Sequence, residues 1–142
     1  MDEQTVPEII SEFLGTFRTL LKFLFDKAKA EGIADCPHLA RARRIAGLAA
    51  DFEPMKIIDN AGFYLYRFRD DIMKHDIDFF FSRIDFEETV EKTSDKQWVE
   101  LTKRIIGRAR DMYPRSTPGE KKYYTDSIRH LLDLYVEYLY KK

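Results

Sequence analysis

Apolar residues recur at intervals of three and four along most of this chain, and that spacing constrains the fold more than any other feature. Because an α-helix has 3.6 residues per turn, side chains at this spacing share one face. In residues 7–30 the recurring positions are Ile10, Phe13, Leu14, Phe17, Leu20, Leu21, Leu24 and Ala28. No stretch shows the period-two alternation that is typical of a β-strand. The sequence therefore predicts an all-α fold.

Helix start and stop signals divide the chain further. Gly32 predicts the end of the first helix, because glycine readily adopts the left-handed conformation found at helix ends. Capping residues followed by proline, glutamate or glutamine predict helix starts near residues 35–37, 94–97 and 117–120. Another amphipathic stretch predicts a helix over residues 54–74, with one or two short helical turns after it. The expected architecture is a bundle of five or six helices.

Length and composition indicate one globular domain spanning residues 1–142. The chain is 44% hydrophobic and 35% charged, which is ordinary for a folded protein with an ion-rich surface. At 142 residues it is long enough to bury a core without disulfides or structural metals. Cys36 is the one cysteine, so an intrachain disulfide and a cluster of thiolate ligands are both excluded.

Two further features concern location. Residues 1–4 are acidic, whereas a signal or transit peptide begins with basic residues. The longest apolar run, residues 20–25, is interrupted by Lys22 and is far shorter than the roughly 20 residues that cross a bilayer. We therefore expect a soluble, intracellular protein without a membrane span.

Residues 62–86, GFYLYRFRDDIMKHDIDFFFSRIDF, combine many aromatic rings with acidic and arginine side chains. Aromatic side chains bury large apolar areas, so neighbouring helices are expected to converge on this segment. Trp98 lies on the inward face of the helix expected after residue 94 and is predicted to be buried against the segment. Met55 is predicted to face inward as well. Gly15, inside the first helix, is expected to mark a close helix crossing.

Three segments carry a resemblance to a known group of proteins. They are YRFRDDI at residues 66–72, the acidic and aromatic residues at 76–86, and LLxLYxxYL at residues 131–139. Together they resemble small helical proteins encoded by large nucleocytoplasmic DNA viruses of protists and algae. The resemblance covers about residues 55–140. It implies a helical fold and a viral protein of the virion or host cytoplasm, and it assigns no functional residue.

Asp71, His75 and Asp78 are spaced so that an unbroken helix would place them on one face. Imidazole and carboxylate groups at that spacing are able to hold a divalent transition metal. The helix break expected near His75 disfavours this arrangement, and acidic residues beside a break are usually caps or solvated. We therefore predict a solvated acidic face, with no metal and no other cofactor.

Candidate catalytic residues are few. Cys36 lies near an expected helix start, but a nucleophilic cysteine needs a base. His38 is two positions further along the same helix and so faces another side. The chain has no glycine-rich phosphate loop and no GxSxG or HExxH motif. We predict a protein that is not an enzyme and has no catalytic residues.

Basic residues suggest nucleic-acid binding as the alternative function. Residues 93–117 contain six basic and three acidic side chains, a net charge of +3, whereas residues 52–92 contain six basic and ten acidic ones, a net charge of −4. If the second and fourth helices lie side by side, one basic patch could contact phosphates. Its candidate members are Arg41, Arg44, Lys103, Arg104 and Arg108. The overall net charge of −1 favours the other interpretation, in which these side chains pair with the acidic segment.

The closing helix carries the candidate interaction surface. Its apolar positions form two rows, one from Tyr124 to Tyr138 and a second with Leu132 and Leu139. One row can dock on the core, and the other would then face outward as a contact surface. The candidate surface residues are Tyr124, Leu132, Tyr135, Tyr138 and Leu139. We therefore predict a non-enzymatic protein-interaction module that binds a protein partner or forms a homodimer, as a viral structural or host-interaction protein.

Overall fold

The computed structural model describes residues 4–32, 40–41, 43–44, 47–48, 51–74, 77, 80, 105 and 107–142. Within these residues the protein is helical and contains no β-strand. The all-α fold class predicted from the apolar spacing is confirmed. The described segments at residues 6–30, 54–74 and 113–141 all contribute side chains to one hydrophobic core. The assignment of the whole of residues 1–142 to a single domain stays a prediction.

Two long helices, two shorter ones and a 3₁₀ helix make up the described fold. In chain order they are α1 (Val6–Ala30), α3 (Pro54–Arg67), α4 (Arg69–Lys74), the 3₁₀ helix η1 (Tyr113–Arg115) and α8 (Pro118–Lys141). The described residues at 40–52 and 105–112 are also helical. The predicted first helix is confirmed to within one residue, and so is the predicted start of the last helix.

Matching capping boxes begin the two long helices. The Thr5 hydroxyl accepts a hydrogen bond from the Glu8 N–H (3.3 Å), and the Glu8 carboxylate accepts one from the Thr5 N–H (3.2 Å). Thr117 and Glu120 make the same two bonds at the start of α8, at 3.2 and 2.9 Å. Each box satisfies N–H groups that the first helical turn would otherwise leave unpaired. Gly32, with a φ of 66°, follows the end of α1 as predicted.

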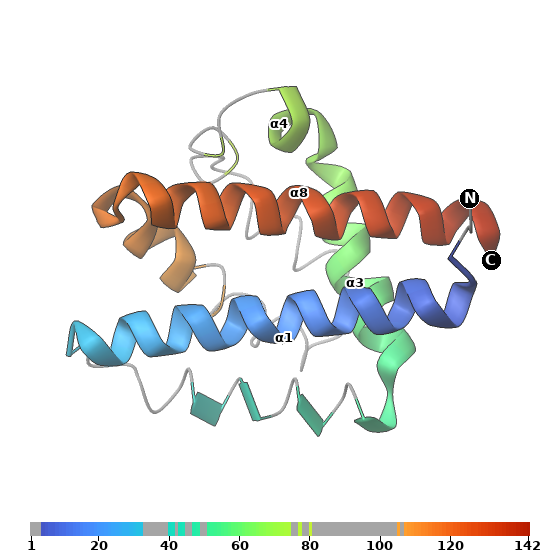
Figure 1. Ribbon diagram of the computed structural model, residues 1–142, viewed down its shortest axis with the longest axis horizontal. Helices are drawn as coiled ribbons and strands as arrows, with labels where there is room; N and C mark the ends of the chain where they lie inside the picture. Colours follow the sequence, from blue (N-terminus) through green and yellow to red (C-terminus); the bar gives the residue numbers. More distant parts are fainter. Residues whose placement is uncertain are drawn as a thin grey trace.

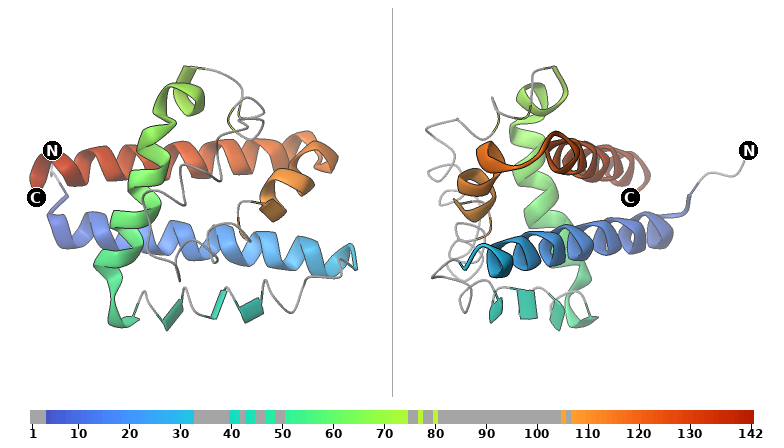
Figure 2. Two further views of the ribbon diagram at one scale, coloured as in Figure 1. Left: turned by 180° about the vertical axis from the view of Figure 1, so that it is seen from behind. Right: turned by 60° about the vertical axis from the view of Figure 1, so that its left-hand side comes forward.

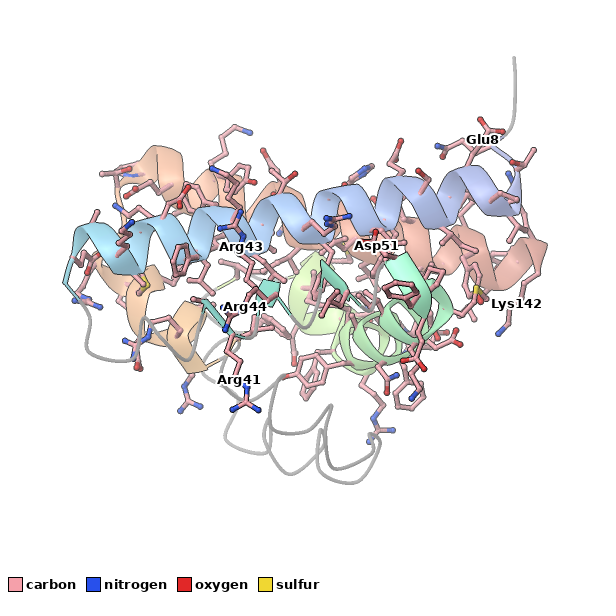
Figure 3. All side chains as sticks on the ribbon, turned by 90° about the horizontal axis from the view of Figure 1, so that it is seen from below. Glu8, Arg41, Arg43, Arg44, Asp51 and Lys142 are labelled. Carbon is pink, nitrogen blue, oxygen red and sulfur yellow. The ribbon has the colours of Figure 1, made fainter. Side chains whose placement is uncertain are left out.

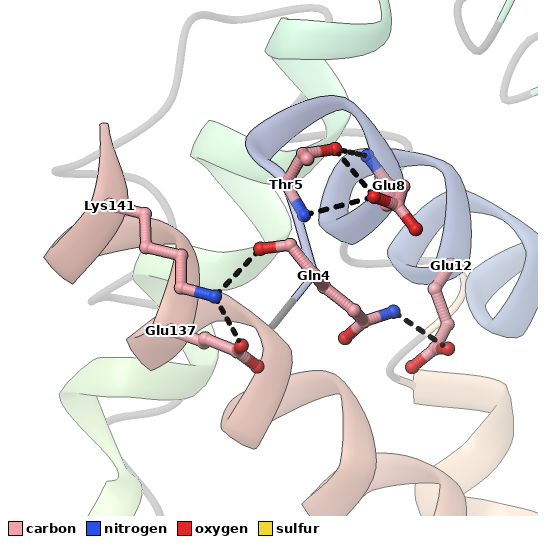
Figure 4. A network of polar contacts seen from close by, with 6 residues as sticks. All are labelled: Gln4, Thr5, Glu8, Glu12, Glu137 and Lys141. Carbon is pink, nitrogen blue, oxygen red and sulfur yellow. Dashed lines mark hydrogen bonds and ion pairs between the residues drawn. The ribbon is translucent and has the colours of Figure 1, made fainter. Parts of the chain in front are cut away.

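α1 and α8 lie side by side and antiparallel (Figure 1, Figure 2). At one end of the pair, Lys141 Nζ donates a hydrogen bond to the Gln4 carbonyl oxygen at 2.7 Å (Figure 4). At the other end, Lys27 Nζ and a carboxylate oxygen of Glu120 are 2.6 Å apart. Contacts at both ends therefore hold the two helices in register, although the first pair is 137 positions apart in sequence.

α3 crosses behind the α1–α8 pair in the view of Figure 1 and packs against both helices. The closest approach is at Gly62, where a Cβ atom would overlap the ring of Tyr135. Glycine permits this approach because it has no side chain. Gly15, which was expected to mark a close crossing, is exposed, and no neighbouring element lies within 4 Å of the position its Cβ would take. That expectation was wrong, because Gly15 lies on the outer side of α1.

The helix predicted over residues 54–74 is divided at Phe68, whose φ and ψ are −108° and 23°. The buried ring of Phe68 packs against Tyr64 and Phe80, with centroid distances of 5.4 and 5.8 Å. A guanidinium nitrogen of Arg69 donates to the Tyr66 carbonyl oxygen at the end of α3 (3.0 Å). The break therefore coincides with the packing of an aromatic side chain and has no proline or glycine to mark it.

Two predictions about burial were wrong. Met55 is 43% exposed, whereas Ile57, which was not predicted to face inward, is fully buried. Packing against α1 and α8 turns the side of α3 that carries Ile57 inward. Asp71, expected on a solvated face, is buried. The predicted burial of Trp98 concerns a residue outside the described part of the chain.

Gly62→Ala is expected to destabilise the fold by about 1–3 kcal/mol, the cost of forcing atoms into a packed contact. The added methyl group would overlap the Tyr135 ring, so that ring or α3 must shift. The measurement is the free energy of unfolding from urea denaturation followed by circular dichroism.

The matched control is Gly15→Ala, which adds the same methyl group where nothing lies within 4 Å. This substitution should stabilise the protein by about 0.5–1 kcal/mol, because alanine is the better helix former. A Gly62→Ala variant that gains as much stability as the control would mean that α3 and α8 are not in close contact here.

Candidate interaction surface

The residues predicted to form a contact surface on α8 lie mostly in the core. Tyr124 and Tyr138 expose 1% and 0% of their surface, and Leu132 and Tyr135 expose 2% and 6%. Leu139 is 38% exposed, so the prediction of an outward row is wrong for Leu132 and holds for Leu139 alone. The reason is that α1 covers one side of α8 while α3 and α4 cover another. These neighbours bury the row from Tyr124 to Tyr138 and, in the second row, Leu132.

Two exposed apolar side chains lie on α3, beside its contact with α8. Met55 and Phe63 expose 43% and 40% of their surface. Asp59 lies between them on the same face, because helical residues four apart are one turn apart. Leu139 is one turn beyond Tyr135, whose ring packs on α3. The junction between α3 and the last turns of α8 therefore carries a partly apolar surface.

A groove opens at this junction. Its volume is about 410 Å³, and it is open to solvent. We call it the α3–α8 groove, and it is lined by Asp59, Asn60, Phe63, Tyr135 and Lys142. Its volume lies in the range of known ligand sites, roughly 300–1,000 Å³. Only Tyr135 belonged to the surface predicted from sequence; the α3 residues were missed because their exposure depends on which side of α3 meets α8.

Two tyrosines connect the groove to the core. The Tyr138 hydroxyl donates a hydrogen bond to Asp59 Oδ1 at 3.3 Å, which ties α8 to α3. The Tyr135 ring stacks on that of Tyr138 at 6.1 Å and meets Tyr66 edge-on at 6.2 Å. Burial, and next the negative charge of Asp59, raise the pKa of both Tyr135 and Tyr138. Both hydroxyls therefore remain protonated at neutral pH and can donate hydrogen bonds.

The predicted basic patch is described only in part. Arg41 and Arg44 are exposed (Figure 3). Arg108 exposes 17% of its side chain, and its guanidinium lies 3.7 Å from the carboxylate of Asp111 in the same segment. The other two members, Lys103 and Arg104, lie outside the described residues. A single patch on the second and fourth helices stays a prediction.

The candidate metal and catalytic residues are likewise described only in part. Asp71 is buried, while its proposed partners His75 and Asp78 lie outside the described residues, as do Cys36 and His38. Within the described ranges, no group of three histidine, cysteine, aspartate or glutamate side chains could hold a metal ion. A non-enzymatic protein without cofactors stays a prediction.

No family model, curated protein or solved structure matches this chain. The resemblance to viral proteins therefore stays a prediction. None of the helices in the described part has the length and apolar character needed to cross a membrane.

Tyr124 is a buried residue with an unusual polar group. Its ring packs near Phe23 and Tyr113, with centroid distances of 5.3 and 5.9 Å. Its hydroxyl is buried and has no hydrogen-bond partner among the described residues. Burial raises the pKa of Tyr124 to about 12, with a further contribution from the negative charges of Glu120 and Glu31. A buried hydroxyl without a partner lowers the stability of a fold.

Tyr124→Phe is expected to raise the free energy of unfolding by about 1 kcal/mol at pH 7, because it removes this hydroxyl. It should also reduce the loss of stability between pH 10 and about 12. In that window the unfolded tyrosine loses its proton while the folded one retains it, so rising pH favours unfolding. Urea denaturation at pH 7 and pH 11 measures both effects.

Tyr138→Phe is the control, because its hydroxyl donates a hydrogen bond to Asp59. Losing that bond should lower the free energy of unfolding by about 0.5–1.5 kcal/mol. If Tyr124→Phe is less stable than the wild type at pH 7, the Tyr124 hydroxyl has a partner after all.

Proposed function

We propose that this protein is a non-enzymatic protein-interaction module, and that its contact surface is the α3–α8 groove together with Met55 and Leu139. The observation that carries the proposal is the exposure of Phe63 and Leu139 beside an open groove that also contains polar groups. Clustered apolar side chains with a polar rim are typical of contact surfaces. The groove is formed by two helices that pack on each other, so a partner would meet a surface that is already shaped.

Leu48, Phe52, Met73 and Tyr140 are also exposed apolar side chains, but none of them lines the groove. Tyr140 is 87% exposed, but it is five residues beyond Tyr135 and therefore faces a different side of α8. Single exposed apolar side chains are common on soluble proteins and need no special explanation. Tyr140 is for that reason a suitable control position.

Phe63→Glu is expected to weaken capture of the partner at least fivefold, because it places a charge at the centre of the apolar contact. The measurement is affinity capture from the native context with tagged wild-type and variant protein, followed by quantitative mass spectrometry. A photo-reactive amino acid at position 63 should cross-link to the same partner protein.

Tyr140→Glu provides the matched control and should capture the partner as the wild type does. Both variants should retain the wild-type melting temperature, since neither side chain is buried. Capture that is unaffected by Phe63→Glu would contradict the proposal. If the captured protein is a second copy of this chain, sedimentation of the purified protein should show a dimer that Phe63→Glu dissociates.

The resemblance over residues 55–140 extends this proposal to the identity of the partner. A viral protein of this kind would bind a virion component or a host protein. Capture from infected cells distinguishes the two, because the recovered protein is encoded by one genome or the other.

Nucleic-acid binding is the alternative, and the exposure of Arg41 and Arg44 favours it. If these side chains contact phosphates, the double variant Arg41→Glu/Arg44→Glu should bind polynucleotide more weakly at low salt. The slope of log affinity against log salt should become shallower by about 2, because two phosphate contacts are lost.

The control for this prediction is Lys22→Glu/Lys29→Glu on α1, which changes the net charge equally at exposed positions. It should leave most of the binding and its salt dependence intact. A wild-type protein that shows no polynucleotide binding at low salt removes the alternative.

A further inference from the structure

The α3–α8 groove presents a carboxylate acceptor, aromatic surface and, at its end, the ammonium group of Lys142. Asp59 contributes a carboxylate, and Phe63 and Tyr135 contribute rings. Asn60 Nδ2 donates to the Lys56 carbonyl oxygen at 2.8 Å, which commits that amide nitrogen to its own helix. A ligand that suits this lining is itself a hydrogen-bond donor with apolar parts.

Asp59 is the acidic side chain in the groove lining, and Lys142 is the basic one. Asp59 is exposed and has no ion pair with another described residue. Its hydrogen bond from the Tyr138 hydroxyl comes from a neutral donor and leaves the charge in place. Burial is the main cause of the raised pKa of Tyr135 and Tyr138, and the negative charge of Asp59 raises both values further. The charge of Asp59 therefore acts on both tyrosines. A carboxylate and aromatic faces in one groove both attract cations.

Lys142 already places an ammonium group beside these rings. Its Nζ lies 5.1 Å from the centroid of the Tyr138 ring, inside the range of about 6 Å for a cation–π contact. Lys142 is exposed and forms no ion pair within the described part of the chain. No ion pair among the described residues therefore opposes the displacement of the Lys142 ammonium group by another cation that reaches the Asp59 carboxylate.

We propose that the α3–α8 groove binds a lysine or arginine side chain of a partner protein, with Asp59 as the counter-ion and Phe63 and Tyr135 as the packing surface. This inference rests on the proposed function of the same groove and adds the chemistry of the partner. An acidic side chain would be repelled by Asp59, and a purely apolar one would cover that carboxylate without a partner. Lys142 competes with the partner's cation.

The test uses tetramethylammonium chloride as the cationic probe and tert-butanol as a neutral probe of similar size. Each is titrated into the isotopically labelled 142-residue chain at constant ionic strength, and amide signals are followed by NMR. Tetramethylammonium should shift the signals of Asn60, Phe63 and Tyr135 saturably and at lower concentrations than tert-butanol.

Three variants sharpen the result. Asp59→Asn preserves the shape and the acceptor for Tyr138 but removes the charge, and it should weaken the cationic probe about two- to fivefold. Phe63→Leu keeps an apolar side chain without a ring and should also weaken it about two- to fivefold. Lys142→Ala should strengthen binding, because it removes the competing ammonium.

Equal responses to the two probes, or unchanged tetramethylammonium binding by Asp59→Asn, would overturn this inference. The proposed contact surface would then be tested separately, by whether Phe63→Glu weakens capture of the partner. If only the tetramethylammonium result contradicts the inference, the groove remains an apolar contact site. If Phe63→Glu also leaves partner capture unchanged, the groove is not a contact site.

Discussion

The ring of Tyr135 lies against Gly62 in α3, where any larger residue would overlap it. This approach determines how near α3 comes to α8 and which side of each helix is covered. Asp59 is three residues before Gly62 and meets Tyr138, which is three residues after Tyr135, so one crossing places both pairs in contact. The hydrogen bond between Tyr138 and Asp59 therefore depends on the glycine contact one turn away.

The same crossing explains why α8 is buried on more than one side. α1 runs antiparallel to α8, and α3 packs against both, so α8 has neighbours on two sides (Figure 2). Two apolar rows on one helix can indicate an outward contact surface or two inward ones, and the number of neighbours decides between them. In this protein most of both rows of α8 faces neighbours, and only Leu139 of the second row is exposed. The exposed apolar side chains near the α3–α8 crossing are Met55 and Phe63 on α3 and Leu139 at the end of α8.

Asp59 has two roles in this arrangement. It accepts the hydrogen bond from Tyr138 that joins α3 and α8, and it remains exposed with its negative charge in the α3–α8 groove. A neutral donor satisfies one oxygen without cancelling the charge, so the residue can stabilise the helix contact and attract a cation together. Asp59 therefore combines a structural contact with the proposed recognition of a cation.

The sequence by itself determined the all-α class, the extent of the first long helix and the start of the last one. Apolar spacing and the capping pair at Thr117 act within one or two turns, so they can be interpreted without tertiary structure. It also singled out Tyr135 and Leu139, but it missed the groove residues of α3. Only the tertiary structure decided that Gly62, not Gly15, is the crossing point and that Phe63 is exposed. The physical reason is that a helix shows the same periodic pattern whether a neighbouring helix or solvent meets its apolar side. Which of the two meets it depends on contacts between residues far apart in the chain.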